Sequence, residues 1–267
     1  MKQSNSTIKA RRAMILSELK SSEHVTVQTL AEKTGASPLT IRRDLAYLEE
    51  QGVVVRYHGG AKLVEADPSV PFFAEKLTRH TDEKKIIADY LAQHIPPNLT
   101  VFMNGGTTTL EVMRATKQSA LTIITNNVLA FESTNGGNCR IICSGGEYNT
   151  ISKTYSDTLS LNIIESTVAD LCILGVNGID ANVGVTTSVH SEATINNLMA
   201  TRCKGPVVII ADSSKIGHAH CFCSLVLDQV NYLITTSKAD PGEIQAIEAC
   251  GVRVILADTA APDELVL

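Results

Sequence analysis

The sequence predicts an α/β protein of two domains, an N-terminal winged helix-turn-helix and a larger α/β domain with a mostly parallel sheet. Residues 1–65 carry three short helical patterns followed by a hairpin pattern. Residues 66–71 contain two prolines and no periodicity, which is typical of a linker. From residue 72 onward, short apolar runs alternate with helical patterns, as in parallel sheets covered on both faces. We therefore expect domains at 1–65 and 72–267.

Three helices are expected in the first domain, and the first covers residues 9–20. Thr26 is a favourable N-cap for the second helix, which ends at Gly35. After a short turn, Ser37 caps the third helix, which runs over residues 37–51 with the sequence SPLTIRRDLAYLEEQ. Two helices joined by a tight glycine-containing turn make a helix-turn-helix, whose second helix enters the major groove of DNA.

The third helix has an apolar face and a polar face. Ile41, Leu45 and Leu48 recur at helical spacing and form the stripe that faces the core. The opposite face carries a guanidinium, a phenol and small side chains. Such a face can read base edges, because arginine recognises guanine and an apolar group can contact the thymine methyl. The alternative is an ordinary surface helix with two solvated arginines.

A hairpin is expected after Gly52, where the run VVVR, a Gly-Gly turn and a return strand follow one another. Arg56, His58 and Lys62 would line this wing within reach of DNA phosphates, although His58 can equally be an ordinary turn histidine. The predicted DNA-binding residues of the third helix and the wing are Ser37, Leu39, Thr40, Arg42, Arg43, Tyr47, Arg56, His58 and Lys62.

The larger domain should begin with a helix that Thr81 caps and that runs to about His94. Apolar runs then predict strands at 100–103, 121–125, 140–143, 171–174, 207–211, 232–235 and 253–256. Helical patterns between them cover 108–115, 157–166, 191–201 and 242–249. Ligands bind beyond the carboxyl ends of the strands in such sheets, so the residues that follow each strand are candidates for a binding site.

Small and polar residues follow five of these strands. The loop NGGTTT after the first strand opens a helix, where glycines let the backbone approach an anion and free N–H groups point at it. One glycine-rich loop is usually a tight turn, but five at equivalent places predict a polar pocket for a phosphorylated small molecule. The predicted effector-binding residues are Asn104, Gly105, Gly106, Thr107, Thr108, Thr109, Thr125, Asn126, Gly145, Gly146, Gly178, Glu192, Asp212 and Lys215.

Charge and composition agree with two domains of different roles. Residues 1–65 contain ten Lys or Arg and seven Asp or Glu, which leaves 13 basic and 21 acidic residues in the remainder. A basic N-terminal region followed by an acidic remainder is typical of a nucleic-acid-binding module joined to another domain. The seven cysteines show no framework spacing, so we expect reduced thiols. The sequence shows neither a membrane-spanning run nor the apolar core of a signal peptide, so we expect a cytoplasmic protein with no membrane partner.

The run SPLTIRRDLAYLEEQGVVVRYHGGA, residues 37–61, resembles the signature of the DeoR family of bacterial transcriptional regulators, which combines a TIRRDL recognition helix with an R-x-HGG wing. The larger domain resembles the effector domain of that family, whose fold is similar to ribose-5-phosphate isomerase. The matching pieces are GGTTT at 105–109, TN at 125–126, GG at 145–146, G-x-NGID at 175–180, EA at 192–193 and DSSK at 212–215. The resemblance implies a repressor whose DNA affinity is changed by a sugar phosphate.

The chain departs from the family pattern at two carboxylates. The family usually has Asp where this chain has Asn104 and where it has Thr236, and a basic residue is common near Asn196 and Asn197. Our hypothesis is that the loss of two carboxylates suits a ligand more anionic than a plain sugar phosphate. We therefore include phosphorylated sugar acids among the expected effectors.

His218, His220, Cys221 and Cys223 together look like a cluster of zinc ligands. On a strand, the two histidines would share one face and the two cysteines the other, so four ligands cannot close one tetrahedral site without a bend. A loop leading into a strand, with the cysteines as small core residues, fits this pattern better. We predict no metal site and no cofactor.

The sequence therefore predicts a DNA-binding transcriptional regulator, a repressor of a carbohydrate-catabolism operon that is relieved by a phosphorylated sugar or sugar acid. Its partners would be double-stranded operator DNA and the small-molecule effector, and homodimers or homotetramers would bind repeated half-sites. The alternative is a sugar-phosphate isomerase-like enzyme with an appended DNA-binding domain, in which Glu192, Asp212 and Lys215 supply acid–base chemistry. A dinucleotide-binding redox sensor is disfavoured, since no G-x-G-x-x-G follows the first strand of the larger domain.

Overall fold

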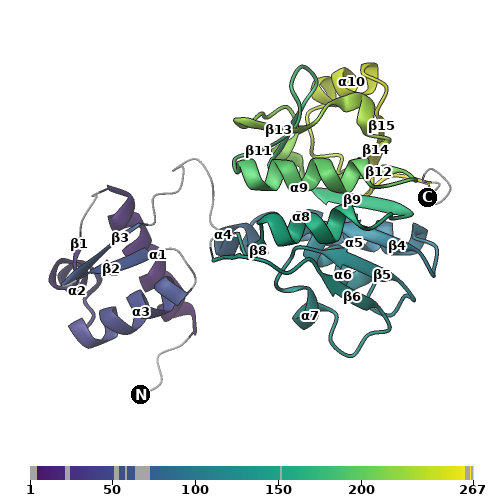
Figure 1. The fold of residues 1–267 in the computed structure, drawn as a ribbon. Coiled ribbons are helices and arrows are strands. Elements are labelled where there is room, and N and C mark those ends of the chain that lie inside the picture. Colours follow the sequence, from purple (N-terminus) through teal and green to yellow (C-terminus); the bar gives the residue numbers. More distant parts are fainter. Residues whose placement is uncertain are drawn as a thin grey trace. The chain divides into compact units, whose positions relative to one another are not determined.

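The computed structural model of the chain describes residues 5–21, 25–50, 54–57, 59–63, 73–150, 152–261, 265 and 267. The chain divides into two compact units, Met1–Ala74 and Glu75–Leu267 (Figure 1). The predicted linker at 66–71 lies outside the described residues, and the division between the units follows it by a few residues. Buried apolar side chains are present in each unit, so each has a core of its own.

The first unit combines helices with a small antiparallel sheet. Its described elements are α1 (Asn5–Ser21), β1 (Val25–Thr26), α2 (Val27–Thr34), α3 (Pro38–Glu50), β2 (Val54–Tyr57) and β3 (Gly60–Leu63). β3 lies between β1 and β2 and pairs antiparallel with both. The apolar stripe predicted for α3 is buried, with Ile41, Leu45 and Leu48 no more than 4% exposed. This arrangement is a winged helix-turn-helix in which β2 and β3 form the wing.

Local side-chain chemistry sets the ends of α2 and α3. Thr26 Oγ1 accepts a hydrogen bond from the N–H of Thr29 at 3.1 Å and so caps α2. Gly35 ends α2 in the left-handed region, with φ 66°, a conformation that glycine adopts at little cost. Ser37 Oγ accepts the N–H of Thr40 at 3.2 Å at the start of α3. These three predicted helix boundaries are confirmed.

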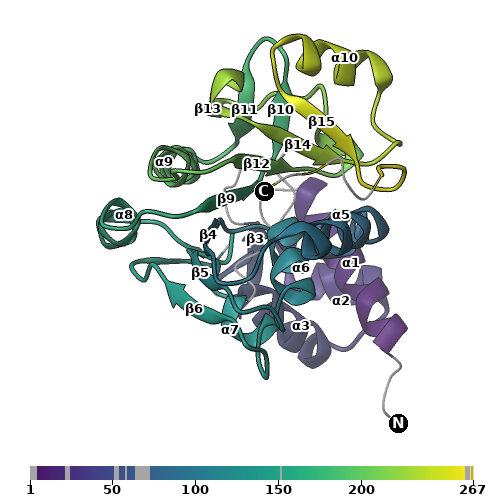
Figure 2. The ribbon, with the colours of Figure 1, turned by 90° about the vertical axis from the view of Figure 1, so that its right-hand side faces the viewer.

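The second unit is built on one parallel sheet of seven strands. They are β4 (Thr100–Met103), β5 (Thr122–Thr125), β6 (Arg140–Cys143), β9 (Leu171–Gly175), β12 (Val207–Ile210), β14 (Tyr232–Thr235) and β15 (Arg253–Leu256). Each corresponds to one predicted strand. The predicted helices are α5 (Thr81–His94), α6 (Thr107–Ala115), α8 (Thr158–Glu165), α9 (His190–Thr201) and α10 (Pro241–Ala249). α8 and α9 lie on one face of the sheet and α5 and α6 on the other (Figure 2).

The strand order contains one reversal. It reads β15-β14-β12-β9-β4-β5-β6, so the chain runs outward from β4 to β6 and then returns to place β9 beside β4. From β9 it continues in the opposite direction through β12 and β14 to β15. The loops that follow β4 and β9 therefore diverge, and ligands bind in the crevice that such a switch point leaves beyond the carboxyl ends of the strands.

Several short elements of the second unit are absent from the sequence prediction. They are α4 (Phe73–Thr78), β7 (Tyr148–Asn149), β8 (Thr154–Tyr155), α7 (Ala130–Ser133), β10 (Gly178–Asp180), β11 (Gly184–Thr187), β13 (Phe222–Leu225) and the 3-10 helices η1 (Ser213–Lys215) and η2 (Leu227–Gln229). β10, β11 and β13 form a separate antiparallel sheet. Elements of two to six residues are too short to show a periodicity. The predicted loop that leads into a strand near residue 222 is confirmed by β13.

The start of α5 differs from the prediction. Thr81 is the first helical residue rather than the cap, and His80 occupies the cap position in the left-handed region with φ 52°. The His80 side chain makes no cap hydrogen bond, and its Nδ1 instead lies 3.0 Å from Oε1 of Glu83. Glu83 is held in turn by residues more than 100 positions away along the chain, which a local capping rule cannot detect.

Candidate functional site

α3 presents a polar face opposite its buried stripe. Leu39 and Tyr47 are 59% and 41% exposed, and Arg42 and Arg43 are exposed as well, whereas Thr40 is half-buried. The predicted base-reading residues therefore lie on the solvent side of one helix. This is the arrangement that insertion into a major groove requires.

A buried carboxylate connects α3 to α1. Asp44 is 3% exposed and accepts hydrogen bonds from Nε of Arg11 at 2.6 Å and from Nε of Arg12 at 2.9 Å. The Arg12 guanidinium also lies 3.5 Å from the centre of the Tyr47 ring, a cation–π contact that positions the phenol. Sequence reasoning missed Asp44. The signal was its helical spacing from Ile41, which puts a carboxylate on the apolar stripe where it must be paired.

The wing residues are described in part. Nε of Arg56 on β2 donates to Oε2 of Glu49 on α3 at 2.6 Å, and the Arg56 N–H donates to Oε1 at 3.2 Å. Lys62 is half-buried on β3, and His58 lies outside the described residues. Arg56 thus has a carboxylate partner within the first unit.

The five polar strand ends of the predicted effector site are neighbours in space. They follow β12, β9, β4, β5 and β6, which are consecutive in the sheet. The sequence predicts the five loops but not that they are neighbours, because the residues of one strand do not indicate which other strand pairs with it. The three central loops meet at the switch point.

Asn104 closes the switch point between β4 and β9. Its side chain is buried, and its Oδ1 accepts the N–H of Gly175 at 2.9 Å. Its Nδ2 donates to Gly175 O and to Asn196 Oδ1, both at 2.8 Å. Both amide hydrogens and the oxygen are therefore engaged within the protein. Asn104 shapes the site by joining two strand ends and α9.

The loops after β4 and β5 support each other. Asn126 Oδ1 accepts the N–H of Gly105 at 2.7 Å, and its Nδ2 donates to Tyr155 O at 3.1 Å. A Cβ on Gly105 would lie 2.0 Å from Cγ2 of Thr154 on β8, so the close approach of the loop after β4 to β8 favours glycine there. Thr125 Oγ1 accepts the backbone N–H that follows Asn126, at 3.0 Å.

The start of α6 has the local form of a helix N-terminus preceded by glycine. Gly106 occupies the cap position, and Thr107 and Thr108 are the first, largely buried residues of the helix. The hydroxyl of Thr109 donates to Asn104 O at 2.9 Å and is thus engaged within the protein. The first N–H groups of a helix have no acceptor within it and carry a partial positive charge. They are therefore free to hold an anion.

Three of the predicted glycines support neighbouring elements. Gly145 and Gly146 have φ of 64° and 105°, and a Cβ on Gly146 would lie 2.0 Å from Oδ1 of Asp157. Asp157 is the N-cap of α8, so these glycines shape the start of that helix. Gly178 belongs to β10, where a Cβ would lie 2.2 Å from His218 O.

The charged residues of the predicted site come from two elements. Asp212, which follows β12, is 2% exposed and accepts the N–H of Ser214 at 3.2 Å as the cap of η1. Lys215 is the last residue of η1 and is half-buried. Glu192 lies in the first turn of α9, and its Oε2 accepts the hydroxyl of Thr187 at 2.8 Å.

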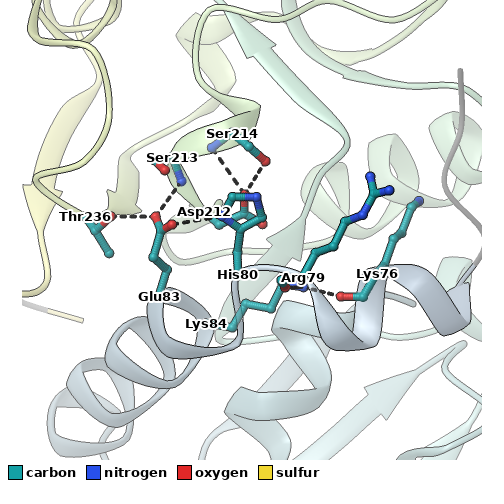
Figure 3. Close-up of polar contacts among 9 residues, drawn as sticks. All are labelled: Lys76, Arg79, His80, Glu83, Lys84, Asp212, Ser213, Ser214 and Thr236. Carbon is teal, nitrogen blue, oxygen red and sulfur yellow. Dashed lines mark hydrogen bonds and ion pairs between the residues drawn. The ribbon is translucent and has the colours of Figure 1, made fainter. Parts of the chain in front are cut away.

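Two further lysines, which sequence reasoning missed, lie close to these residues. Lys84 of α5 is 4% exposed, and its Nζ donates to the backbone oxygens of Lys76 and Arg79 (Figure 3). Lys76 of α4 donates from Nζ to Asn177 Oδ1 at 3.1 Å. The available signal for Lys84 was its helical spacing from Ile87, which places an ammonium group on the buried face of α5.

Electrostatics connect the three lysines. Burial lowers the pKa of Lys76, Glu192 raises it, and the charge of Lys215 lowers it. Burial likewise lowers the pKa of Lys84, Asp212 raises it, and Lys215 lowers it. The three ammonium groups are therefore near enough to oppose one another's protonation, and the carboxylates of Asp212, Glu192 and Glu111 act in the opposite direction.

Glu83 connects α5 to the loops after β12 and β14. Its Oε2 accepts the N–H of Ser213 at 2.9 Å and the hydroxyl of Thr236 at 2.7 Å, and its Oε1 lies 3.0 Å from His80 Nδ1 (Figure 3). Burial raises the pKa of Glu83, but these hydrogen bonds, led by that from Ser213, outweigh burial and lower the pKa to about 2. Glu83 is therefore ionised at neutral pH.

The described residues show neither a metal-binding cluster nor a membrane-spanning helix. Among the described residues, no three His, Cys, Asp or Glu side chains are arranged to hold a metal ion. Cys221, which precedes β13, and Cys223 within β13 are exposed free thiols rather than core residues, and Phe222 between them is the more buried side chain. The described helices include none with the length and apolar character needed to cross a bilayer.

Two family models match the chain. The DeoR-like helix-turn-helix domain matches residues 11–67, and the DeoR C terminal sensor domain matches residues 79–237. The chain belongs to the DeoR family. It is therefore a DNA-binding transcriptional regulator with a C-terminal sensor domain. The first match covers the winged helix-turn-helix from the middle of α1 onward, and the switch-point loops lie within the second.

Similar proteins cover nearly the whole chain. The HTH-type transcriptional regulator GlpR of Haloferax volcanii is 30% identical over 246 residues, 92% of this chain and 96% of the relative. GolR of Listeria innocua is 29% identical over 250 residues, 93% of this chain and 98% of the relative. The glycerol-3-phosphate regulon repressor of Escherichia coli is 33% identical over 205 residues, 76% of this chain and 81% of the relative. These relatives are regulators, so the enzyme alternative is set aside.

Ribose-5-phosphate isomerases are among the solved structures that resemble part of the chain. Ribose-5-phosphate isomerase A of Methanocaldococcus jannaschii has a TM-score of 0.38 and 10% identity, covering 51% of this chain and 54% of the isomerase. The enzyme from Neisseria gonorrhoeae has a TM-score of 0.37 and 16% identity, covering 49% and 52%. A similarity of this size carries no conclusion about activity or ligand.

Proposed function

We propose that this regulator represses a carbohydrate-catabolism operon and that a phosphorylated sugar or sugar acid releases it from DNA. In this proposal α3 reads the operator through Arg42 and Arg43, and the wing contacts the DNA backbone. The phosphate of the effector binds between the start of α6 and Lys215. The ligand acts only through its different affinities for the DNA-competent and DNA-incompetent arrangements.

The observation that carries the proposal is the group of three lysines near the switch point. Lys215 lies near enough to Lys76 and Lys84 to lower the pKa of both ammonium groups, and neighbouring carboxylates act in the opposite direction. Buried ammonium groups that repel one another favour an anion as a third partner. A phosphate supplies both the charge and several acceptor oxygens. One similar protein is named as the repressor of the glycerol-3-phosphate regulon, which supports both repression and a small phosphorylated compound.

Homodimers or homotetramers are part of the same proposal. Winged and helix-turn-helix regulators bind operators with repeated half-sites, and symmetric proteins match such repeats. Sedimentation equilibrium of the full-length protein should therefore give a mass of two or four chains. A monomer at micromolar concentration, with or without selected DNA, would contradict this part of the proposal.

The experiment starts with DNA that the full-length protein selects from a random-sequence library. Fluorescence anisotropy at fixed ionic strength then measures the Kd of this DNA with ribose 5-phosphate, 6-phosphogluconate or inorganic phosphate, and with unphosphorylated ribose and gluconate as controls. We expect at least one phosphorylated compound to weaken DNA binding by about fivefold or more. Selection of no DNA sequence, or equal Kd values with all compounds, would overturn the proposal.

A further inference from the structure

Lys76 connects the beginning of the second unit to the switch point of its sheet. It lies on α4, the first described helix after residues 64–72, which join the winged domain to the sensor domain along the chain. Its Nζ donates to Asn177 Oδ1 at 3.1 Å across 101 residues of sequence. Asn177 follows β9 directly after Gly175 and Val176, so the ammonium group of Lys76 reaches the loop where the strand order reverses.

The orientation of Asn177 is set by other contacts. Its Nδ2 donates to the hydroxyls of Thr187 at 3.2 Å and Ser188 at 3.0 Å, so its Oδ1 is directed to Lys76. Among the described residues, Asn177 is the one hydrogen-bond partner of the Lys76 ammonium group. An ammonium group has three donors, so two of them have no partner among the residues that the structure describes.

The charges around Lys76 favour an anion. Lys76 is half-buried, Glu192 lies near enough to attract it and Lys215 near enough to repel it. The carboxylate of Glu192 is already engaged by the hydroxyl of Thr187. A ligand oxygen that carried negative charge between Lys76 and Lys215 would therefore relieve the repulsion between the two ammonium groups.

α4 and the lysine group form one network. Lys84, whose ammonium group also senses the charge of Lys215 and Asp212, donates to the backbone oxygens of Lys76 and Arg79 (Figure 3). The end of α4 is therefore attached to the site through its backbone, and its middle is attached through the Lys76 side chain. A change at the site acts on both attachments.

We propose that Lys76 is an effector-sensing residue, which binds the anionic group of the effector together with Lys215 and thereby holds α4, the helix at the end of the interdomain segment. This proposal rests on the proposed function and deepens it. When Lys76 binds the ligand, α4 is held more firmly. α4 follows the segment of the chain that connects to the winged domain, so a change at the site can reach that domain. The ligand chemistry is that of a phosphate or carboxylate on a small carbohydrate.

The binding test compares full-length variants that differ at one charge. Lys76→Gln removes the charge and keeps an amide donor for Asn177, whereas Lys76→Arg keeps the charge. Lys85→Gln is the matched control, because it removes an exposed charge from α5. Isothermal titration with inorganic phosphate should show about tenfold weaker binding for Lys76→Gln, because a charge-assisted hydrogen bond is lost. Lys76→Arg and Lys85→Gln should stay within about threefold of the wild type.

The sensing test uses hydrogen–deuterium exchange and DNA binding. Phosphate should slow amide exchange in the peptide that contains α4 in the wild type and in Lys85→Gln, and should leave it unchanged in Lys76→Gln. A purely structural role of Lys76 would alter exchange in the absence of phosphate and preserve the response to phosphate. In the anisotropy assay, a phosphorylated compound that raises the Kd of the wild-type protein for DNA should raise the Kd of Lys76→Gln by at most half as large a factor. The comparison is made at compound concentrations that saturate both proteins.

The outcomes separate the two proposals. If the wild type responds to a phosphorylated compound and Lys76→Gln binds phosphate and releases DNA equally well, the role of Lys76 is overturned and the proposed function stands. If the wild type binds no phosphate and no phosphorylated compound changes its DNA affinity, both are overturned. If Lys76→Gln loses phosphate binding but phosphate never affects α4 exchange in the wild type, Lys76 binds without sensing and the proposal fails.

Discussion

At the residue scale, Glu83 shows how a single side chain can join distant segments. Its carboxylate is 3% exposed, and it is held by the Ser213 N–H, the Thr236 hydroxyl and His80. These donors keep its pKa at about 2, below the ordinary value of 4.5, although burial acts in the opposite direction. The ionised form of Glu83 is thus favoured by folding.

This depressed pKa predicts a pH-dependent contribution to stability. A folded-state pKa of about 2 against 4.5 when unfolded corresponds to about 3 kcal/mol, present above pH 4.5 and lost as the pH falls toward 2. Urea unfolding should therefore show Glu83→Gln less stable than the wild type at pH 7, with the difference shrinking at pH 3. Asp82→Asn, on an exposed neighbour, is the control. A difference that stays constant over this range would contradict the role of ionised Glu83.

Asn104 places an uncharged amide side chain at a position where the family usually has a carboxylate. Its amide nitrogen donates to Gly175 O and Asn196 Oδ1, and both acceptors are buried or nearly so. Aspartate at this position could not donate to either. We therefore expect the departure at Asn104 to be coupled to the amide of Asn196, which accepts its hydrogen bond.

Asn104→Asp should destabilise the sensor domain by about 2 kcal/mol or more, because an ionised carboxylate would face two oxygen acceptors in a buried place. Adding Asn196→Lys should recover part of the loss by supplying a cation. Denaturant midpoints of the single and double variants measure this coupling. The control Asn162→Asp, on an exposed position of α8, should change stability little. Equal loss in the single and double variants would refute the coupling.

At the scale of elements, α3 depends on the division between its two faces. The buried face packs Ile41, Leu45 and Leu48, and the buried Asp44 is neutralised by arginines of α1. The solvent face is left with Arg42 and Arg43, which are exposed. The helix is thus attached through one face and offers the other to a groove.

Arg43→Ala should weaken binding of the selected DNA by about 1–3 kcal/mol and reduce discrimination against random DNA, because a base-reading guanidinium is removed. Arg140→Ala removes the same charge from an exposed position on β6 in the sensor domain and should leave DNA affinity unchanged. Anisotropy titrations against selected and random DNA measure both effects. If Arg43→Ala weakens both DNAs equally, Arg43 contacts phosphate and does not read sequence.

At the scale of the whole molecule, each unit carries its own core. The large apolar cluster of the second unit includes Phe102, Ile209 and Met199, and its described members all belong to that unit. The parallel sheet and its helices therefore have an apolar core of their own. Two cooperative units joined by a single segment suit a regulator in which one unit binds DNA and the other a ligand.

Residues 75–267 alone should therefore fold cooperatively, bind inorganic phosphate with nearly the wild-type Kd and fail to bind the selected DNA. Differential scanning calorimetry, isothermal titration and anisotropy measure these three properties, with the full-length protein as the reference. DNA binding by this fragment would show that the sensor domain, rather than α3 and the wing, holds the operator.

Residues close together in the chain allowed much of this fold to be predicted. Alternating apolar runs predict all seven strands of the parallel sheet, and the caps Thr26, Gly35 and Ser37 predict the helix-turn-helix. These signals are local, since a strand or helix repeats its pattern within a few residues. The polar loops after five strands were predicted for the same reason. That these loops contact a ligand remains a proposal.

Sequence alone determined the kind of elements, their order along the chain and the residue types at the strand ends. The tertiary structure decided that β9 returns beside β4, that Asn104 meets Asn196 across 92 residues, and that Lys76 and Lys84 join Lys215. These relations depend on contacts between segments far apart in the chain, and their free energies arise only when the whole sheet has formed. A local pattern holds no information about them, which is why the charged centre of the sensor domain became visible only in three dimensions.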